Sequence, residues 1–146
     1  MKKIICWVLL CALACCMFAC TDDQDQTPDE TPKFEVLSWE EYVAAEVGSK
    51  VVIEAYVQGH QSWWDNKITV YLQDVDGGYY AYEMACSEED AAKLTPGTKI
   101  AVKGYKGEWA GEIEIMDATF EFVEGADSYI ADAVDLTDVL GTDELV

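Results

Sequence analysis

The stretch HQSWWDNK, residues 60–67, holds the side chains best suited to ligand contact in this sequence. Trp63 and Trp64 are adjacent, and the only histidine, His60, stands close by. Aromatic rings stack on nucleobases, sugar rings and cations, so the pair predicts either a ligand platform or a cap over the end of a core. A single histidine cannot build a multi-histidine zinc site, and we interpret His60 as a loop residue.

The sequence carries no catalytic signature: it has no HExxH, CxxC, phosphate-binding glycine loop or GxSxG motif. Glu112 and Glu114 share one face of an expected strand, as solvated acids often do, and do not indicate a glycosidase pair. Cys86 is the only cysteine after residue 20, and we expect it to be a small buried side chain rather than a nucleophile. The prediction is a protein that is not an enzyme and uses no cofactor and no metal.

Charge restricts the partners. The chain has 29 acidic residues and nine basic ones, all of them lysines, and its formal net charge is −20. Proteins bind phosphate polymers through basic patches in which arginine is favoured, and only Lys67, Lys103 and Lys106 are near the loops of interest. Nucleic acid is therefore an unfavourable partner, whereas glycans, cations, basic peptides and proteins remain open.

Residues 1–19 have the pattern of an export signal. Two lysines precede an unbroken apolar run that is too short for a stable membrane-spanning helix. Cys20 follows, and the composition then changes to the acidic TDDQDQTPDETP. The pattern resembles a bacterial lipoprotein signal, which implies cleavage before Cys20, lipid on that residue, and anchoring to the cell membrane on the side facing away from the cytoplasm. Cys15 is a weaker alternative site, and an ordinary secretory signal or an uncleaved anchor is an alternative interpretation.

Beyond the acidic tether the hydrophobic period is mostly two, which is typical of strands. Ser38 and Glu41 predict a capping box at the start of a short helix that Gly48 ends. A second short helix begins after Ser87. The expected helices cover 38–48 and 87–94, and the expected strands cover 51–59, 67–74, 78–85, 98–108 and 111–125.

Five strands with a short helix between the third and fourth are typical of an OB-fold, a mainly β Greek-key barrel. The run from about 50 to 125 resembles the OB-fold modules of exported lipoproteins of gut-type bacteria. The pieces that carry the resemblance are VVIEAYVQG, QSWWDNK, TVYLQD, YEMACSEED, LTPGTKIAVKGY and GEIEI. An SH3-like barrel or a small sandwich is the alternative, and the resemblance does not identify a ligand.

In this fold, the loops that join strands 1 to 2 and 4 to 5 flank a binding face on strands 2 and 3. Trp63 and Trp64 lie in the first loop and Trp109 in the second, so we expect these tryptophans to converge on one rim. The outward positions of strands 1 and 2 add Tyr56 and Tyr71. The alternative is that the tryptophans pack against the barrel and that the tyrosines are cross-strand neighbours.

The sequence thus predicts a membrane-anchored, extracytoplasmic lipoprotein whose OB-fold binds a glycan or a protein without catalysis. A nucleic-acid-binding module and a purely structural module are the alternatives. The acidic end of the chain is expected to dock on the barrel or to be an unfinished connection to another region. The expected divisions are a signal peptide (1–19), an acidic flexible tether (20–32), the barrel with its short N-terminal helix (33–125) and the acidic tail (126–146).

Overall fold

The computed structural model describes residues 35–142. The predicted signal peptide, the lipidation site at Cys20 and the tether lie outside these residues. The described elements all belong to one compact unit, Phe34–Val146. Within the described range, no helix has both the length and the apolar character needed to cross a bilayer.

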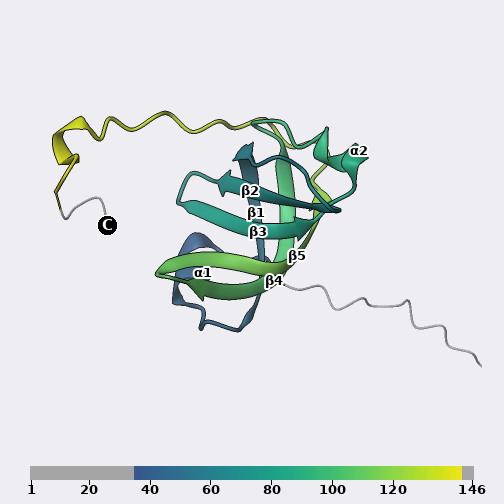
Figure 1. Cartoon of the computed structure of the whole chain (residues 1–146), viewed down its shortest axis with the longest axis horizontal. Helices are drawn as coiled ribbons and strands as arrows, with labels where there is room; N and C mark the ends of the chain where they lie inside the picture. The colour runs from purple at the N-terminus through teal and green to yellow at the C-terminus, as the bar shows by residue number, and fades with distance from the viewer. Residues whose placement is uncertain (1–34, 143–146) are drawn as a thin grey trace, which may run out of the picture. The chain divides into compact units, whose positions relative to one another are not determined.

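Five strands close into a barrel with the neighbour order β1-β2-β3-β5-β4, and β4 pairs back onto β1 (Figure 1). This mainly β topology, with a short helix between β3 and β4, confirms the expected OB-fold. The expected strand ranges agree with the observed ones to within a few residues. The elements are α1 (Trp39–Ala44), β1 (Lys50–His60), β2 (Lys67–Gln73), β3 (Gly78–Ala85), α2 (Glu88–Ala91), β4 (Lys99–Trp109), β5 (Glu112–Phe122) and the 3-10 turn η1 (Thr137–Val139).

β1 closes the barrel because its first half pairs with β4 and its second half pairs with β2. Val57 pairs with Leu72, but Gly59 pairs with Tyr71, so Gln58 is the extra residue of a β-bulge. The bulge bends β1 between its two partners.

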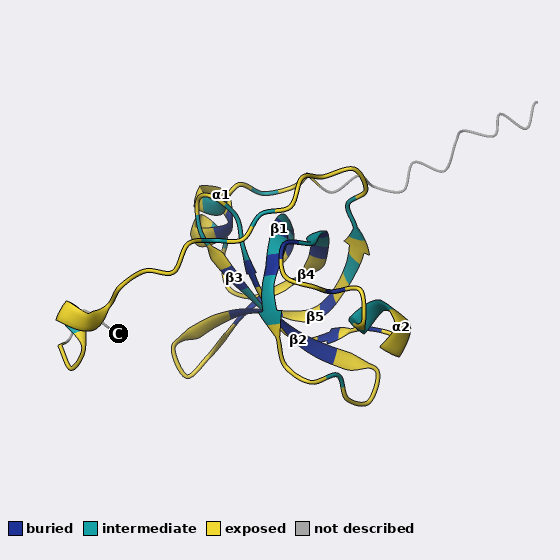
Figure 2. Ribbon diagram, turned by 90° about the horizontal axis from the view of Figure 1, so that it is seen from above, coloured by how far each residue is buried: buried dark blue, intermediate teal, exposed yellow. Residues whose placement is uncertain are grey.

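The core follows the two-residue period of the strands. Alternate residues of β1 from Val51 to Val57 are each at most 1% exposed, as their spacing predicts. Figure 2 shows buried and exposed segments alternating along the strands. Cys86 is 6% exposed at the end of β3, so the expectation of a buried cysteine is confirmed. Burial raises the pKa of its thiol, with a smaller contribution from Asp90, and both effects oppose thiolate formation.

Helix α1 ends earlier than predicted. Ser38 and Glu41 form the expected capping box, but the chain leaves the helix at Ala45, before Gly48. The buried ammonium of Lys106 explains this end, because its Nζ donates hydrogen bonds to the carbonyl oxygens of Tyr42, Val43 and Ala45 at 2.8–2.9 Å. A cation at the C-terminus of a helix satisfies carbonyls that have no partner within the helix.

A side chain, rather than a left-handed glycine, shapes the turn between β2 and β3. Neither Gly77 nor Gly78 has positive φ. Asp74 Oδ1 instead accepts hydrogen bonds from the backbone N–H groups of Asp76 and Gly77, each at 2.8 Å. Glycine is needed at position 77 because a Cβ there would collide with the indole ring of Trp39.

The start of the C-terminal segment contacts the barrel at the β1 bulge. Gln58 Nε2 donates to the carbonyl of Tyr129 at 3.3 Å, and Gln58 Oε1 accepts from the backbone N–H of Ala131 at 2.9 Å. Farther along the segment, Val134 and Leu140 are 77% and 68% exposed. The contacts with the barrel are therefore concentrated near residues 129–131.

Tyr42 of α1 and Tyr79 of β3 offer a matched test of the core. Tyr42 is 3% exposed and its hydroxyl has no hydrogen-bond partner among the described residues, whereas Tyr79 donates to Asp74 Oδ2 at 2.8 Å. A buried hydroxyl without a partner costs free energy, so Tyr42→Phe should leave the free energy of unfolding unchanged or raise it by up to about 1 kcal/mol. Tyr79→Phe should lower it by about 1 kcal/mol. Urea unfolding at pH 7 measures both, and equal losses in the two variants would contradict the assignment.

Tyr42 also predicts how the stability of the protein depends on pH. Burial raises the pKa of Tyr42 to about 12 in the folded protein, above the value near 10 of an unfolded chain. The unfolded state therefore loses its proton first, and stability falls as the pH rises from about 10 to about 12. Tyr42→Phe should flatten this fall, because phenylalanine does not ionise.

Candidate functional site

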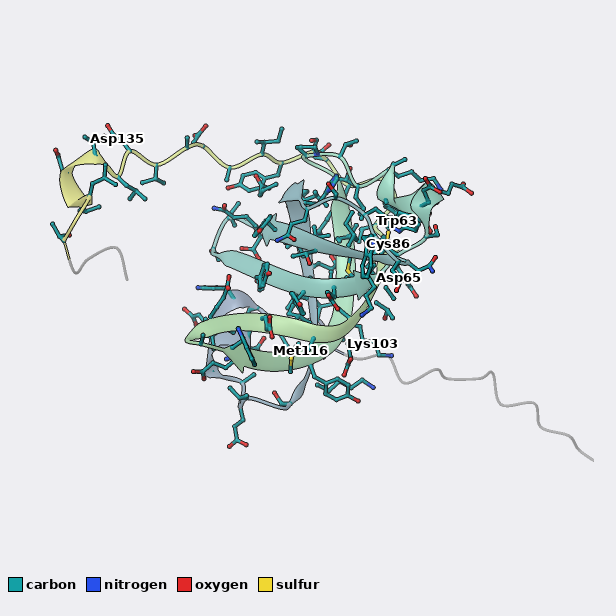
Figure 3. The ribbon with its side chains drawn as sticks, in the orientation of Figure 1. Trp63, Asp65, Cys86, Lys103, Met116 and Asp135 are labelled. Carbon is teal, nitrogen blue, oxygen red and sulfur yellow. The ribbon has the colours of Figure 1, made fainter. Side chains whose placement is uncertain are left out.

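The loop between β1 and β2 separates its two tryptophans. Trp63 is half-buried against the core, and its Nε1 donates a hydrogen bond of 2.9 Å to the carbonyl of Cys86, as Figure 3 allows the reader to follow. Trp64 forms a backbone bridge with Lys67, and its side chain is 72% exposed. Trp63 therefore pins the loop to the end of β3, and Trp64 is free to meet a ligand.

Trp109 does not share a rim with Trp64, contrary to the expectation from the loop pattern. It ends β4, is 75% exposed, and precedes a turn in which Ala110 and Gly111 have positive φ. β5 runs parallel to β3 with Ala81 beside Ile115, so the β4–β5 turn lies toward the start of β3. Lys67, by contrast, pairs with Ala85 at the end of β3. The two loops thus flank the β2–β3 face from opposite ends (Figure 1).

Tyr56 and Tyr71, expected to lie together on the ligand face, are separated by the structure. The Tyr56 ring packs edge-on against Tyr129 of the C-terminal segment, with 5.4 Å between ring centroids, and the ammonium of Lys99 lies 5.7 Å from its centroid. Tyr71 is 44% exposed on β2 and pairs with Tyr80 rather than with Tyr56. The C-terminal segment therefore covers Tyr56 and leaves Tyr71 open.

A strip of three tyrosines crosses the outer face of β2 and β3. The rings of Tyr71 and Tyr80 are stacked, with centroids 5.4 Å apart and planes inclined by 29°, and Tyr82 lies 6.3 Å beyond Tyr80. Gln61 Nε2 in the preceding loop donates to the Tyr71 hydroxyl at 3.0 Å, which orients that ring. The strip presents aromatic surface at the face where OB-folds bind ligands.

Sequence reasoning missed Tyr80 and Tyr82. Tyr79 is only 4% exposed and points into the barrel. The run GYYAY places aromatic residues at both parities, so hydrophobic alternation alone does not tell which tyrosine faces outward. The small residue Ala81 was the usable signal, since it is fully buried and fixes Tyr80 and Tyr82 on the opposite face.

Acidic and apolar side chains of β5 continue this face. Because Ala81 and Ile115 are both buried and adjacent, Glu114 and Met116 face outward beside the tyrosine strip. Burial raises the pKa of Tyr80, and the charges of Glu112 and Glu114 add to the increase. Glu114 is 7% exposed, so the expectation of solvated acids on this strand was wrong for that residue.

A groove of about 530 Å³ adjoins the strip where β3 and β5 diverge. Glu83 and Asp117 have positive φ at register shifts in the two strands, so the strands bulge apart there. Tyr82 and Met116 line both the groove and the outer face. The face is therefore a shallow surface that deepens at one end, where Asp65, Glu83 and Asp117 are part of a mixed polar lining.

The lysines do not form a basic groove with these aromatics. Lys106 is 5% exposed and is bound to the end of α1. Lys67 pairs with Glu83, with 2.8 Å between Nζ and Oε2, and this contact raises the pKa of Lys67 and lowers that of Glu83. In the described part of the chain no group of three or more histidine, cysteine or acidic residues is arranged to hold a metal ion.

Comparison with known proteins gives structural likenesses only. No family model matches the chain, and no curated protein matches it at the level of sequence. The hypothetical protein ygiW from E. coli is 16% identical over 63% of this chain and 94% of its own, with a TM-score of 0.47. Asparaginyl-tRNA synthetases from Pyrococcus horikoshii and Entamoeba histolytica are 20% and 17% identical over 77% of this chain, with TM-scores of 0.47 and 0.49. The chain spans 27% of the length of each synthetase.

The two loop tryptophans should respond differently to truncation. Trp63→Ala removes a half-buried indole and its hydrogen bond, so the free energy of unfolding should fall by about 2–3 kcal/mol. Trp64→Ala removes an exposed side chain and should change it by less than about 0.5 kcal/mol. Thermal or urea unfolding of the two variants measures the difference, and a large loss on Trp64→Ala would show that this residue packs against the barrel.

Proposed function

We propose that this chain is a non-catalytic binding module whose ligand face is the outer surface of β2 and β3. The stack of the exposed Tyr71 on the half-buried Tyr80 carries the proposal, because two rings held in register across strands form a rigid platform. Rigid aromatic surfaces contribute contact area at a low cost in conformational entropy. A glycan or a protein segment is the favoured ligand class.

The charge of the face supports this choice over nucleic acid. Glu112 and Glu114 lie beside Tyr80, and Glu83 lies next to Tyr82. Single-stranded nucleic acid brings one negative charge per nucleotide, and proteins that stack its bases provide a positively charged groove. Lys67, which lies close to Tyr82, is already paired with Glu83. Binding of nucleic acid is the alternative that the same experiment tests.

We also propose that the barrel is held at the outer side of the cell membrane by lipid on Cys20. The support is the sequence alone: a basic start, an apolar run, Cys20, and then an abrupt change to acidic residues. The acidic stretch that follows contains two prolines and little to bury, which suits a spacer between a membrane and a folded domain.

Removal of the tyrosine platform should abolish ligand binding. We expect a saturable change in fluorescence anisotropy with labelled oligosaccharides or peptides, and an affinity at least about tenfold weaker in the double variant Tyr71→Ser, Tyr80→Ser. Val134→Ser is the control, since Val134 is exposed in the C-terminal segment beyond its contacts with the barrel and should leave the affinity unchanged. Preferred binding of a single-stranded oligonucleotide, with steep salt dependence, would favour the nucleic-acid alternative.

Cys20 should carry the lipid. The mass of the chain extracted from membranes should match cleavage before Cys20 plus acyl groups, and Cys20→Ala should remove the lipid. Cys15→Ala should retain it and serves as the control. Acylation that survives Cys20→Ala, or release of an unmodified chain, would contradict the assignment.

A further inference from the structure

Glu114 is a buried carboxylate without a cation. It is 7% exposed, and within the described residues it forms neither a hydrogen bond nor an ion pair. A buried charge costs free energy unless an opposite charge or several hydrogen bonds compensate it. Its carboxylate oxygens are not among the unpartnered side-chain atoms that are sealed from solvent, so a positive group can reach them and replace the partial hydration that they keep.

The surroundings of Glu114 are aromatic and apolar. On one side, the pairing of β3 with β5 places Tyr80 and Tyr82 on the same outer face as Glu114. On the other side, Glu114 pairs with Gly107 of β4, which has no side chain, and the Met116 side chain lies where a Cβ of Gly107 would be. The carboxylate thus sits between tyrosine rings and a thioether.

We infer that this face binds a basic protein segment and that Glu114 receives one of its lysine or arginine side chains. The inference rests on the proposed function and specifies its ligand. An ammonium or guanidinium group interacts favourably with a carboxylate and with the faces of aromatic rings at the same time. The alkyl stem of such a side chain packs against Met116 and the tyrosine rings.

Charge over a longer range agrees with a basic partner. The chain has a formal net charge of −20 and a pI of about 4.1, so it attracts positively charged segments and repels polyanions. The adjoining groove, lined by Asp65 and Asp117, extends the acidic surface beyond Tyr82. Lys67 neutralises Glu83 in this groove, whereas Glu112 and Glu114 beside Tyr80 form no ion pair within the described residues.

A neutral glycan suits the face less well. Its hydroxyl groups can donate hydrogen bonds to Glu114, but they leave the buried negative charge without a counter-charge. A single-stranded nucleic acid would bring further negative charge to the same position. Loss of the Glu114 charge should therefore weaken the binding of a basic segment, whereas it should not weaken the binding of a neutral glycan or of a nucleic acid.

The test uses the full chain in a non-ionic detergent and a fluorescein-labelled peptide of alternating glycine and lysine. Fluorescence anisotropy should show saturable binding at physiological ionic strength, and Glu114→Gln should weaken it by about tenfold or more. Glu121→Gln is the matched control, because it removes the same charge from an exposed position farther along β5. Glu121→Gln should weaken binding by less than about twofold.

Stability provides the second measurement. Removal of an uncompensated buried charge should leave the urea midpoint of Glu114→Gln equal to or above that of the parent, so lost binding cannot be attributed to unfolding. Equal weakening by Glu114→Gln and Glu121→Gln would overturn the inference, because attraction would then be nonspecific. Binding of an oligosaccharide but not of the peptide, with loss in the Tyr71→Ser, Tyr80→Ser variant, would overturn it and leave the proposed function standing. Binding of neither ligand to this face would overturn both.

Discussion

The pairing of β1 with two strands at once is the constraint on which the barrel depends. β1 pairs with β4 along its first half and with β2 along its second half, so the strand must bend between them. The bulge at Gln58 provides that bend, because an extra residue increases the local twist and changes the direction of a strand. It also turns the Gln58 side chain toward the C-terminal segment, where it binds Tyr129 and Ala131.

The scarcity of lysines then determines the character of the surface. Nine lysines face 29 acids, and several of those on the barrel are already engaged by the fold. Lys106 holds the end of α1, Lys99 pairs with Glu54 at 2.7 Å, and Lys67 pairs with Glu83. Exposed pairs of this kind add little stability, but they use the positive charge that the acidic face lacks. Glu114 is left uncompensated as a result.

Much of the fold was predictable because burial follows a short period. Val51, Ile53 and Val57 alternate with more exposed residues, and this pattern identified β1 without knowledge of its partners. The helix start at Ser38 was equally readable, since a capping box is local. The end of the same helix was not, because Lys106 reaches it from a strand more than sixty residues later in the sequence.

The candidate site, like the fold, was predictable from the sequence only in part. The sequence by itself determined that the barrel is acidic, that it has a β2–β3 face, and that aromatic residues are available for that face. Only the tertiary structure decided which aromatics are used. Trp63 turns inward because the carbonyl of Cys86 lies within reach, and Tyr56 is covered because the β1 bulge anchors Tyr129 nearby. The outward position of Tyr80 and the inward position of Tyr79, like the burial of Glu114, depend on how β3 and β5 are paired, and pairing between distant strands is not encoded in any local period.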